Sequence, residues 1–183
     1  MTNASAPLTT IHLSPGDWRT ARNGERLVTV LGSCVAVCLW DPRLRIAGMN
    51  HFMLPGDPTA GTIYEDAKFG VHSMELLITA LQKLGTQREH LEAKLFGGGA
   101  VLESVSSANV GTRNAEFALE YLEREGIPVV AQDLYGRHAR KIVYDTAANR
   151  VHVKYLKAPL RLMAAEIDFQ AQHKPPVGTV ELF

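Results

Sequence analysis

The sequence predicts an α/β fold with a layered architecture, and three observations lead to this prediction. Every residue from Cys34 to Trp40 is apolar, so the strand formed there is expected to be covered on both faces. Apolar residues recur at helical spacing from Ala67 to Leu84, which predicts an amphipathic helix. Between Glu92 and Ala131 the pattern changes from strand to helix and back to strand, an order typical of a right-handed crossover between parallel strands.

The first half of the chain is expected to form a short strand and a hairpin. Thr10–Leu13 has the pattern of a strand, which ends at the turn residues Ser14 to Gly16. The turn Asp41–Leu44 then folds the two flanking apolar runs into a hairpin. If its loop is centred on Pro42 and Arg43, paired residue numbers sum to 85, and Cys34 lies directly opposite His51. A polar loop, Pro55–Thr62, follows.

The second half of the chain alternates helices and strands. The helix that contains Ala67 is expected to end at a glycine cap, Gly85. The elements expected after it are a strand at Glu92–Phe96, a loop at Gly97–Gly99, a helix at Thr112–Glu125 stopped by Gly126, and a strand at Ile127–Ala131. A final hairpin is expected to pair Lys141–Asp145 with Arg150–Leu156 around the turn Thr146–Asn149.

Length, charge and hydropathy limit the classes of protein to consider. A chain of 183 residues with 46% hydrophobic residues suits a single domain spanning 1–183, with its core at about 10–157 and a C-terminal tail at 158–183. The 19 basic residues balance the 19 acidic ones, so no global field attracts nucleic acid or anionic lipid. Met1–Trp18 lacks the apolar stretch of a signal peptide, and Val28–Trp40 is too short for a membrane span. We therefore expect a cytoplasmic protein with reduced thiols and no direct membrane insertion.

Cys34 and His51 are the candidate catalytic pair. Directly opposed side chains have Cβ atoms roughly 4.5–5.5 Å apart, within reach of the thiol–imidazole hydrogen bond that activates a cysteine nucleophile. Gly32 and Ser33 precede Cys34, and a glycine in a β-branched run indicates a bulge whose backbone N–H groups could stabilise an oxyanion. The alternative is that Cys34 is a small apolar core residue.

Other residues carry weaker signals. Cys38 lies on the same strand face as Cys34 but about 13 Å away, so we interpret it as a packing residue. With two cysteines and no Cys/His ligand spacing, the sequence predicts neither a metal site nor a cofactor. Gly97–Gly99 are not accompanied by a GxGxxG or P-loop pattern, so they do not predict a nucleotide site.

Several sequence blocks together resemble one known protein family. These blocks are LGSCVAVCLWDP at Leu31–Pro42, AGMNHFMLP at Ala47–Pro55, AKLFGGGA at Ala93–Ala100, NVGTRN at Asn109–Asn114, Asp133 with Gly136 and Arg140, and VHVKYL at Val151–Leu156. They resemble the CheD family, the chemoreceptor glutamine deamidases of bacterial chemotaxis, follow one another in the family's order and cover roughly residues 10 to 157.

The resemblance implies a protein-glutamine deamidase acting on methyl-accepting chemotaxis receptors without a cofactor. Cys34 matches the family's nucleophile and His51 its base. A threonine upstream of the cysteine completes the family's catalytic triad, and Thr29 is the nearest candidate. Five residues of regular strand would, however, turn Thr29 to the opposite face from Cys34. A bulge at Gly32 and Ser33 would bring it back. The implied fold resembles the cysteine-dependent deamidase toxins, with stacked β-sheets flanked by helices.

One departure and two alternatives accompany this resemblance. Tyr135 and Ala139 occupy positions where the family tends to have glycine, so the loop at these residues is expected to differ in conformation from that of the family. The family also implies docking on receptors and on a CheC-type phosphatase, so a non-catalytic regulator of chemotaxis is one alternative. An amidase acting on small molecules is the other.

Overall fold

The computed structural model describes residues 9–22, 24–54, 63–101, 105–157 and 168. The elements within these residues are β1 (Thr10–His12), β2 (Trp18–Ala21), β3 (Arg26–Leu31), β4 (Val35–Asp41), β5 (Ile46–Phe52), α1 (Ile63–Lys83), the 3-10 helix η1 (Arg88–His90), β6 (Glu92–Gly97), α2 (Val105–Arg124), β7 (Val129–Leu134), β8 (Ala139–Asp145) and β9 (Arg150–Leu156).

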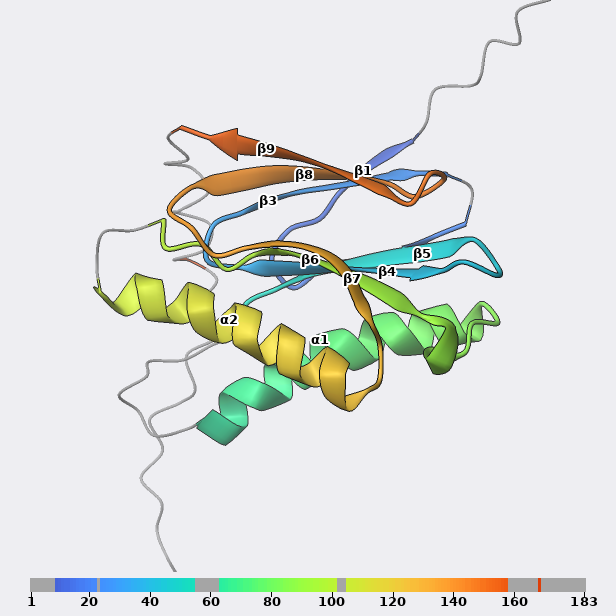
Figure 1. Ribbon diagram of the computed structural model, residues 1–183, viewed down its shortest axis with the longest axis horizontal. Coiled ribbons are helices and arrows are strands. Elements are labelled where there is room, and N and C mark those ends of the chain that lie inside the picture. The colour runs from blue at the N-terminus through green and yellow to red at the C-terminus, as the bar shows by residue number, and fades with distance from the viewer. Residues whose placement is uncertain (1–8, 23, 55–62, 102–104, 158–167, 169–183) are drawn as a thin grey trace, which may run out of the picture.

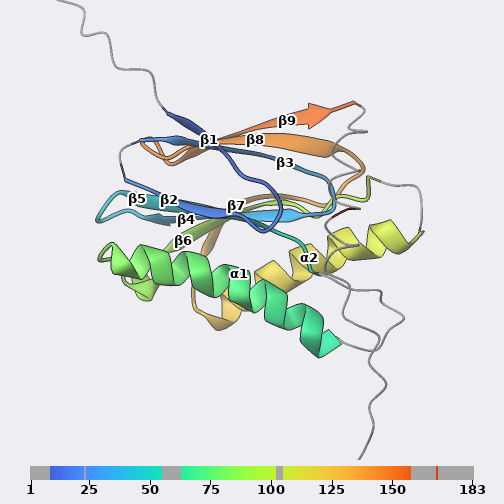
Figure 2. The ribbon, with the colours of Figure 1, turned by 180° about the vertical axis from the view of Figure 1, so that it is seen from behind.

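The strands form two stacked sheets (Figure 1). The four-stranded sheet has the order β1-β3-β8-β9, and the five-stranded sheet has the order β2-β5-β4-β6-β7. Helices α1 and α2 both cover the outer face of the five-stranded sheet, as the opposite view also shows (Figure 2). The predicted α/β class, with stacked sheets flanked by helices, is therefore confirmed.

Strand β4 contributes to two separate cores, because it lies in the middle layer. Val35, Val37 and Leu39 face the helices, where they pack with α1 and α2 residues such as Leu77 and Leu122. Ala36, Cys38 and Trp40 belong to the second core, between the two sheets. All seven residues of β4 are buried, which explains why this stretch of sequence is apolar on both faces.

The register of the β4–β5 hairpin differs from the predicted one by two residues. Asp41 pairs with Ile46 and Ala36 pairs with His51, so paired numbers sum to 87 and Cys34 does not lie directly opposite His51. The loop is shifted because the Asp41 carboxylate accepts the N–H groups of Arg43 and Leu44, and Arg45 takes a left-handed φ of 55°. A shift of two residues keeps every side chain on its predicted face.

The predicted bulge at Gly32 and Ser33 is wrong, because this segment joins two sheets rather than interrupting one strand. β3 ends at Leu31 in the four-stranded sheet, and β4 begins at Val35 in the five-stranded sheet. Cys34 thus immediately precedes the first residue of β4. The alternation argument that turned Thr29 away from Cys34 does not apply, since the two residues belong to different layers.

Most other predicted elements are present within the described residues. β1, the parallel pairing of β6 with β7, and the β8–β9 hairpin are confirmed. The sequence prediction missed β2 and started α2 at Thr112, seven residues after the observed start at Val105. The Pro55–Thr62 loop and almost all of the 158–183 tail lie outside the described residues.

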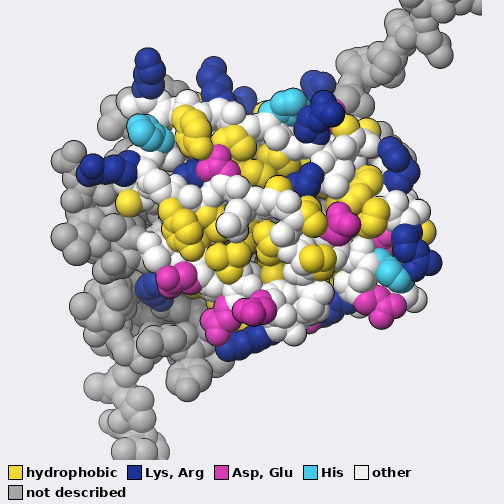
Figure 3. Space-filling model, in the orientation of Figure 1, with side chains coloured by type: hydrophobic (Ala, Val, Ile, Leu, Met, Phe, Trp, Pro, Cys, Tyr) yellow, Lys and Arg dark blue, Asp and Glu magenta, His cyan; other side chains and the backbone are white. Residues whose placement is uncertain are grey.

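The face seen in Figure 3 carries charges of both signs around a central group of hydrophobic side chains. This distribution agrees with the equal numbers of basic and acidic residues in the sequence. Among the residues that the structure describes, no helix is long and apolar enough to cross a membrane.

Candidate active site between the two sheets

Thr29 and His51 meet across the interface between the sheets. Thr29 lies on β3 of the four-stranded sheet and His51 on β5 of the five-stranded sheet. The Thr29 Oγ1 atom is 2.8 Å from His51 Nδ1. The structure therefore brings together two of the three predicted catalytic residues, from different layers of the fold.

The position of the ring proton of His51 follows from this contact. The Thr29 hydroxyl donates its single proton to the carbonyl oxygen of Leu13, at 2.8 Å. It can then only accept at its other contact, so His51 Nδ1 must carry a hydrogen and donate it to Thr29. In a neutral ring this leaves Nε2 with a lone pair, which is the form that acts as a base.

The backbone of His51 is held by the turn that precedes β2. His51 N–H donates to the Asp17 carbonyl at 2.9 Å, and the His51 carbonyl accepts from Gly16 N–H at 2.8 Å. Hydrogen bonds on this edge and β-pairing with β4 on the other leave the strand little freedom to rotate. The histidine ring is thus directed by two neighbouring strands and by Thr29.

The Cys34 segment is fixed through three successive carbonyl groups. The Gly32 carbonyl accepts from Gly99 N–H and the Cys34 carbonyl from Gly98 N–H, each at 2.8 Å. Between them, the Ser33 carbonyl accepts from Asn114 Nδ2, also at 2.8 Å. Residues from the β6–α2 region therefore determine how the chain passes from one sheet to the other.

Glycines make this close backbone contact possible. A Cβ atom on Gly97 would lie 2.1 Å from the Cys34 carbonyl oxygen, and Gly97 has a φ of 112°. A Cβ on Gly111 of α2 would lie 2.7 Å from the carbonyl oxygens of Gly98 and Gly99. The N–H groups of Gly98 and Gly99 bond to the carbonyl oxygens of Cys34 and Gly32.

The sequence prediction missed Asn114, Gly98 and Gly99 as residues that support the Cys34 segment. The three consecutive glycines were visible directly after a predicted buried strand. Strands β4 and β6 are neighbours, with Val35 paired to Gly97, and this pairing is what brings the glycines to Cys34. Without the order of strands in the sheet, the sequence signal could not be connected to the cysteine.

The two cysteines are equally buried but differ in position. The exposed fractions of Cys34, His51 and Thr29 are 0%, 1% and 3%. Cys38 lies within β4, and burial raises the pKa of its thiol far above the ordinary value. Cys38 is therefore a packing residue, as predicted. Because the candidate residues are also buried, reagents or substrates reach Cys34 only when the surrounding packing opens.

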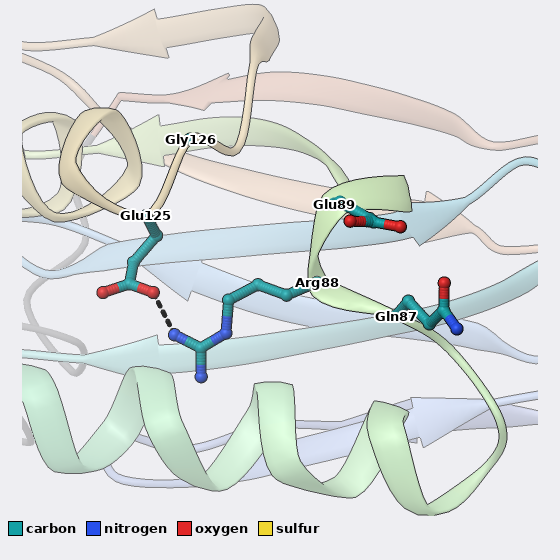
Figure 4. A pocket seen from close by; sticks show the side chains of 5 residues that line it. All are labelled: Gln87, Arg88, Glu89, Glu125 and Gly126. Atoms are coloured by element: carbon teal, nitrogen blue, oxygen red, sulfur yellow. Dashed lines mark hydrogen bonds and ion pairs between the residues drawn. The ribbon is translucent and has the colours of Figure 1, made fainter.

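Two surface hollows differ in their relation to this site. The larger one, of about 640 Å³, is lined by Gln87, Arg88, Glu89, Glu125 and Gly126 (Figure 4). It adjoins η1, at the start of β6, whereas Cys34 contacts Gly98 after the end of β6. A smaller hollow of about 210 Å³ lies beside the end of β5 and is lined by Gly16, Phe52, Met53, Phe69, His72, Ser73 and Leu76. Only the smaller hollow adjoins the His51 strand.

No cluster of three or more His, Cys, Asp or Glu side chains that could hold a metal is found in the described part of the chain. The fold and the site together define an α/β protein of two stacked sheets, with Thr29 and His51 in contact between them and Cys34 in the segment that passes from one sheet to the other.

Comparison with known proteins shows the family. The family model described as CheD chemotactic sensory transduction matches residues 53–155. A Shewanella oneidensis protein named probable chemoreceptor glutamine deamidase CheD 1 is 45% identical, over 94% of this chain and 87% of its own. A Dechloromonas aromatica protein of the same name is 47% identical, over 92% and 86% of the two chains. The chain belongs to the CheD family.

One similar solved structure is the hypothetical protein YfiH of Bacillus licheniformis. It is 14% identical, the match covers 81% of this chain and 57% of that one, and the TM-score is 0.47.

Proposed function

We propose that this protein is a glutamine deamidase that converts selected glutamines of chemotaxis receptors to glutamates. The relatives named probable chemoreceptor glutamine deamidase support the reaction and the substrate class. The observation that carries the proposal is the hydrogen bond from His51 Nδ1–H to Thr29, because it leaves Nε2 as the basic nitrogen of the neutral ring.

In the proposed mechanism, His51 accepts the proton of the Cys34 thiol and the thiolate attacks the carboxamide carbon of glutamine. The tetrahedral intermediate collapses to a thioester as His51 returns the proton to the departing ammonia. His51 then takes a proton from water, hydroxide attacks the thioester, and the thiol leaves. The sum is glutamine plus water giving glutamate plus ammonia, with Cys34 regenerated.

The two peptide groups that join Gly32 to Ser33 and Ser33 to Cys34 are proposed to support the oxyanion through their N–H groups. In a trans peptide the N–H points away from the preceding C=O. Since the Gly32 and Ser33 carbonyls point toward Gly99 and Asn114, the N–H groups of Ser33 and Cys34 are directed to the other side of the segment. An oxyanion formed at Cys34 on that side would meet these donors.

The proposal extends to the partners and the compartment. The substrates are methyl-accepting chemotaxis receptors, and a CheC-type phosphatase is a proposed second partner. Both cysteines are free thiols, and the cytoplasm keeps thiols reduced. We therefore propose that the protein acts on the cytoplasmic parts of its receptors.

Mass spectrometry of a purified receptor cytoplasmic domain, incubated with and without the protein, tests this function. Each deamidated glutamine gains about 1 Da, and we expect the gain at selected sites with wild type but not with Cys34→Ala or His51→Ala. Unchanged deamidation by Cys34→Ala would remove the cysteine from the mechanism. No deamidation by folded wild type would instead favour the non-catalytic regulator.

A second measurement separates a protein substrate from a small one. Free glutamine lacks the remote contacts that would position its amide at a buried cysteine, so we expect it to be a poor substrate. Ammonia release is measured from free glutamine and from the receptor domain at equal concentrations of glutamine side chains. Similar efficiency on both would favour the small-molecule amidase.

A further inference from the structure

Asn114 joins the two segments that carry the proposed nucleophile and base. Its side chain is completely buried, at 0% exposure, on the face of α2 that packs against the five-stranded sheet. Asn114 Nδ2 donates to the Ser33 carbonyl at 2.8 Å. Asn114 Oδ1 accepts from the Leu54 N–H, also at 2.8 Å.

The orientation of this amide is fixed by its partners. A carbonyl oxygen such as that of Ser33 can only accept, and a backbone N–H such as that of Leu54 can only donate. The Nδ2 and Oδ1 positions therefore cannot be exchanged. No side chain with only a donor or only an acceptor satisfies both groups, so asparagine is specifically suited to this place.

The two groups held by Asn114 lie close in sequence to the proposed catalytic residues. Ser33 immediately precedes Cys34, and Leu54 lies three residues after His51, just past the end of β5. The Asn114 side chain thus connects the end of the His51 strand to the start of the Cys34 strand, beside the contact of 3.7 Å between Ser33 Oγ and Met53 Sδ. Other positions on α2 act on the same segment, since Gly111 packs on the carbonyls of Gly98 and Gly99.

We infer that Asn114 is a positioning residue for the deamidation: it aligns Cys34 with His51 through Ser33 and Leu54, without touching the substrate. The inference rests on the proposed function. It also assigns α2 a catalytic purpose, because the helix supplies a side chain that bonds to the backbone of both segments. A displacement of about 1 Å between reacting groups can reduce a rate by about 100-fold.

The test uses Asn114→Leu and Asn114→Asp in the full chain. The leucine variant removes both hydrogen bonds, whereas the aspartate variant keeps an acceptor for Leu54 N–H and loses the donor to Ser33. For each variant we expect kcat on the receptor domain to fall about 10- to 100-fold with little change in KM. Thr146→Val is the matched control, because it removes the hydrogen bond of another buried polar side chain, from Thr146 Oγ1 to the Glu25 carbonyl at 2.7 Å, just before β3.

A second readout separates positioning from simple loss of stability. Alkylation of Cys34 by iodoacetamide is followed against pH by peptide mass spectrometry, well below the unfolding midpoints of all the variants. In the Asn114 variants the midpoint of the Cys34 profile should move to higher pH, because His51 no longer faces the sulfur correctly and the thiolate loses that partner. Thr146→Val should leave the profile unchanged, and Cys38 serves as an internal reference in every sample.

The outcomes distinguish this inference from the proposed function. If Cys34→Ala is inactive but both Asn114 variants retain wild-type kcat and an unchanged Cys34 profile, the positioning role is overturned and the deamidase remains. If neither Asn114 variant folds, Asn114 belongs to the fold alone and the inference is equally overturned. If Cys34→Ala keeps full activity, the proposed function itself fails.

Discussion

Thr29 shows how much one hydroxyl group determines at this site. Its proton is committed to the Leu13 carbonyl, so its oxygen accepts from His51 and selects the ring tautomer. A threonine side chain is stiff at χ1, which holds the oxygen in one direction. The role that the family resemblance implied for Thr29 is thus proposed here on a specific physical basis, the tautomer of His51.

Thr29→Val should slow deamidation without abolishing it. The change removes an acceptor from His51 Nδ1–H and leaves the Leu13 carbonyl unpaired in a buried place, which costs about 1–3 kcal/mol of stability. We expect kcat to fall about 10- to 100-fold, because the ring loses its orientation but keeps its chemistry. Steady-state kinetics on the receptor domain measures this.

Thr29→Ser is the matched control, since it keeps the hydroxyl and should recover most of the rate. Equal losses in the serine and valine variants would show that the methyl group matters and the hydroxyl does not.

At this scale the sequence predicted the candidate residues but not their geometry. Cys34 and His51 were paired by the numbering of a hairpin loop, and the loop proved to lie one residue further along the chain, which moves each pairing partner by two residues. The even shift preserves the predicted face of each strand residue, but it places Ala36 rather than Cys34 opposite His51, and the catalytic pair stays a prediction. The contact between Thr29 and His51 was not predictable, because no local pattern shows that the chain changes sheets at Gly32.

At the scale of elements, the loop after β6 supports the strand that begins with Val35. Gly97 has a φ of 112°, and the space for its Cβ is occupied by the Cys34 carbonyl. Gly126, which ends α2 with a φ of 66°, has no atom within 4 Å of its Cβ position. The two glycines therefore face the same type of backbone strain but very different surroundings.

Gly97→Ala should lower the free energy of unfolding and the deamidation rate far more than Gly126→Ala does. Left-handed backbone alone costs a non-glycine residue about 1–2 kcal/mol, which is the whole loss expected at Gly126. At Gly97 the added methyl must also displace the Cys34 carbonyl, so we expect a larger loss of stability together with loss of deamidation. Urea unfolding and activity assays on both variants measure the difference, and equal losses at the two positions would contradict the close contact.

Arg88, in η1, connects helix α1 to the end of helix α2 through ion pairs. Its guanidinium is 2.9 Å from Glu75 on α1 and also pairs with Glu125, directly after α2 (Figure 4). The hydrogen bond from Arg88 lowers the pKa of Glu75, with a further contribution from the Tyr121 hydroxyl. The network is partly exposed, so solvent screens it and its contribution is modest.

Glu75→Gln should reveal this contribution as a pH-dependent difference in stability. Because the pKa of Glu75 is lowered in the folded protein, the stabilisation is complete above its ordinary value of 4.5 and disappears as pH falls through the lowered value. We expect wild type to exceed the variant by less than about 1 kcal/mol at neutral pH, with the gap closing in acid. Urea unfolding across this pH range measures it.

Glu116→Gln, on the exposed surface of α2, is the control and should not show the acid-dependent gap. A difference in stability between wild type and Glu75→Gln that increased as pH fell would contradict the lowered pKa of Glu75.

The elements that the sequence missed have physical explanations. Strand β2 is short and partly exposed, and its four residues gain their order from pairing with β5 rather than from an apolar pattern. The observed start of α2 at Val105 precedes the predicted one, and Gly111 lies inside the helix. In the structure Gly111 is required inside the helix, where any Cβ would collide with the glycine loop.

At the scale of the whole molecule, the candidate site depends on how closely the two sheets pack. Thr29 pairs directly with Ile142 of β8, so the two side chains lie on the same face of the four-stranded sheet. Ile142 is fully buried in the core between the sheets. Ile78 is equally buried, but in the core between the five-stranded sheet and the helices.

Ile142→Val and Ile78→Val form a matched pair of core substitutions. Each removes one methylene group and should lower stability by about 0.5–1.5 kcal/mol. Only Ile142→Val should also lower kcat, because it loosens the packing beside Thr29. Denaturant unfolding and receptor deamidation, measured for both variants at a temperature where both are folded, provide the comparison. A similar fall in kcat for both would indicate a dependence on general stability instead.

The strand order has a consequence for how the protein is made. β3, which carries Thr29, pairs in the centre of its sheet with β8, and β8 begins at Ala139. A ribosome that has translated the chain as far as His138 has already incorporated Thr29, Cys34 and His51, but not the strand that completes the layer behind Thr29. The proposed catalytic residues are encoded early, and the arrangement proposed for them is completed late. A nascent or prematurely released chain would therefore carry the whole proposed triad and remain inactive toward receptors.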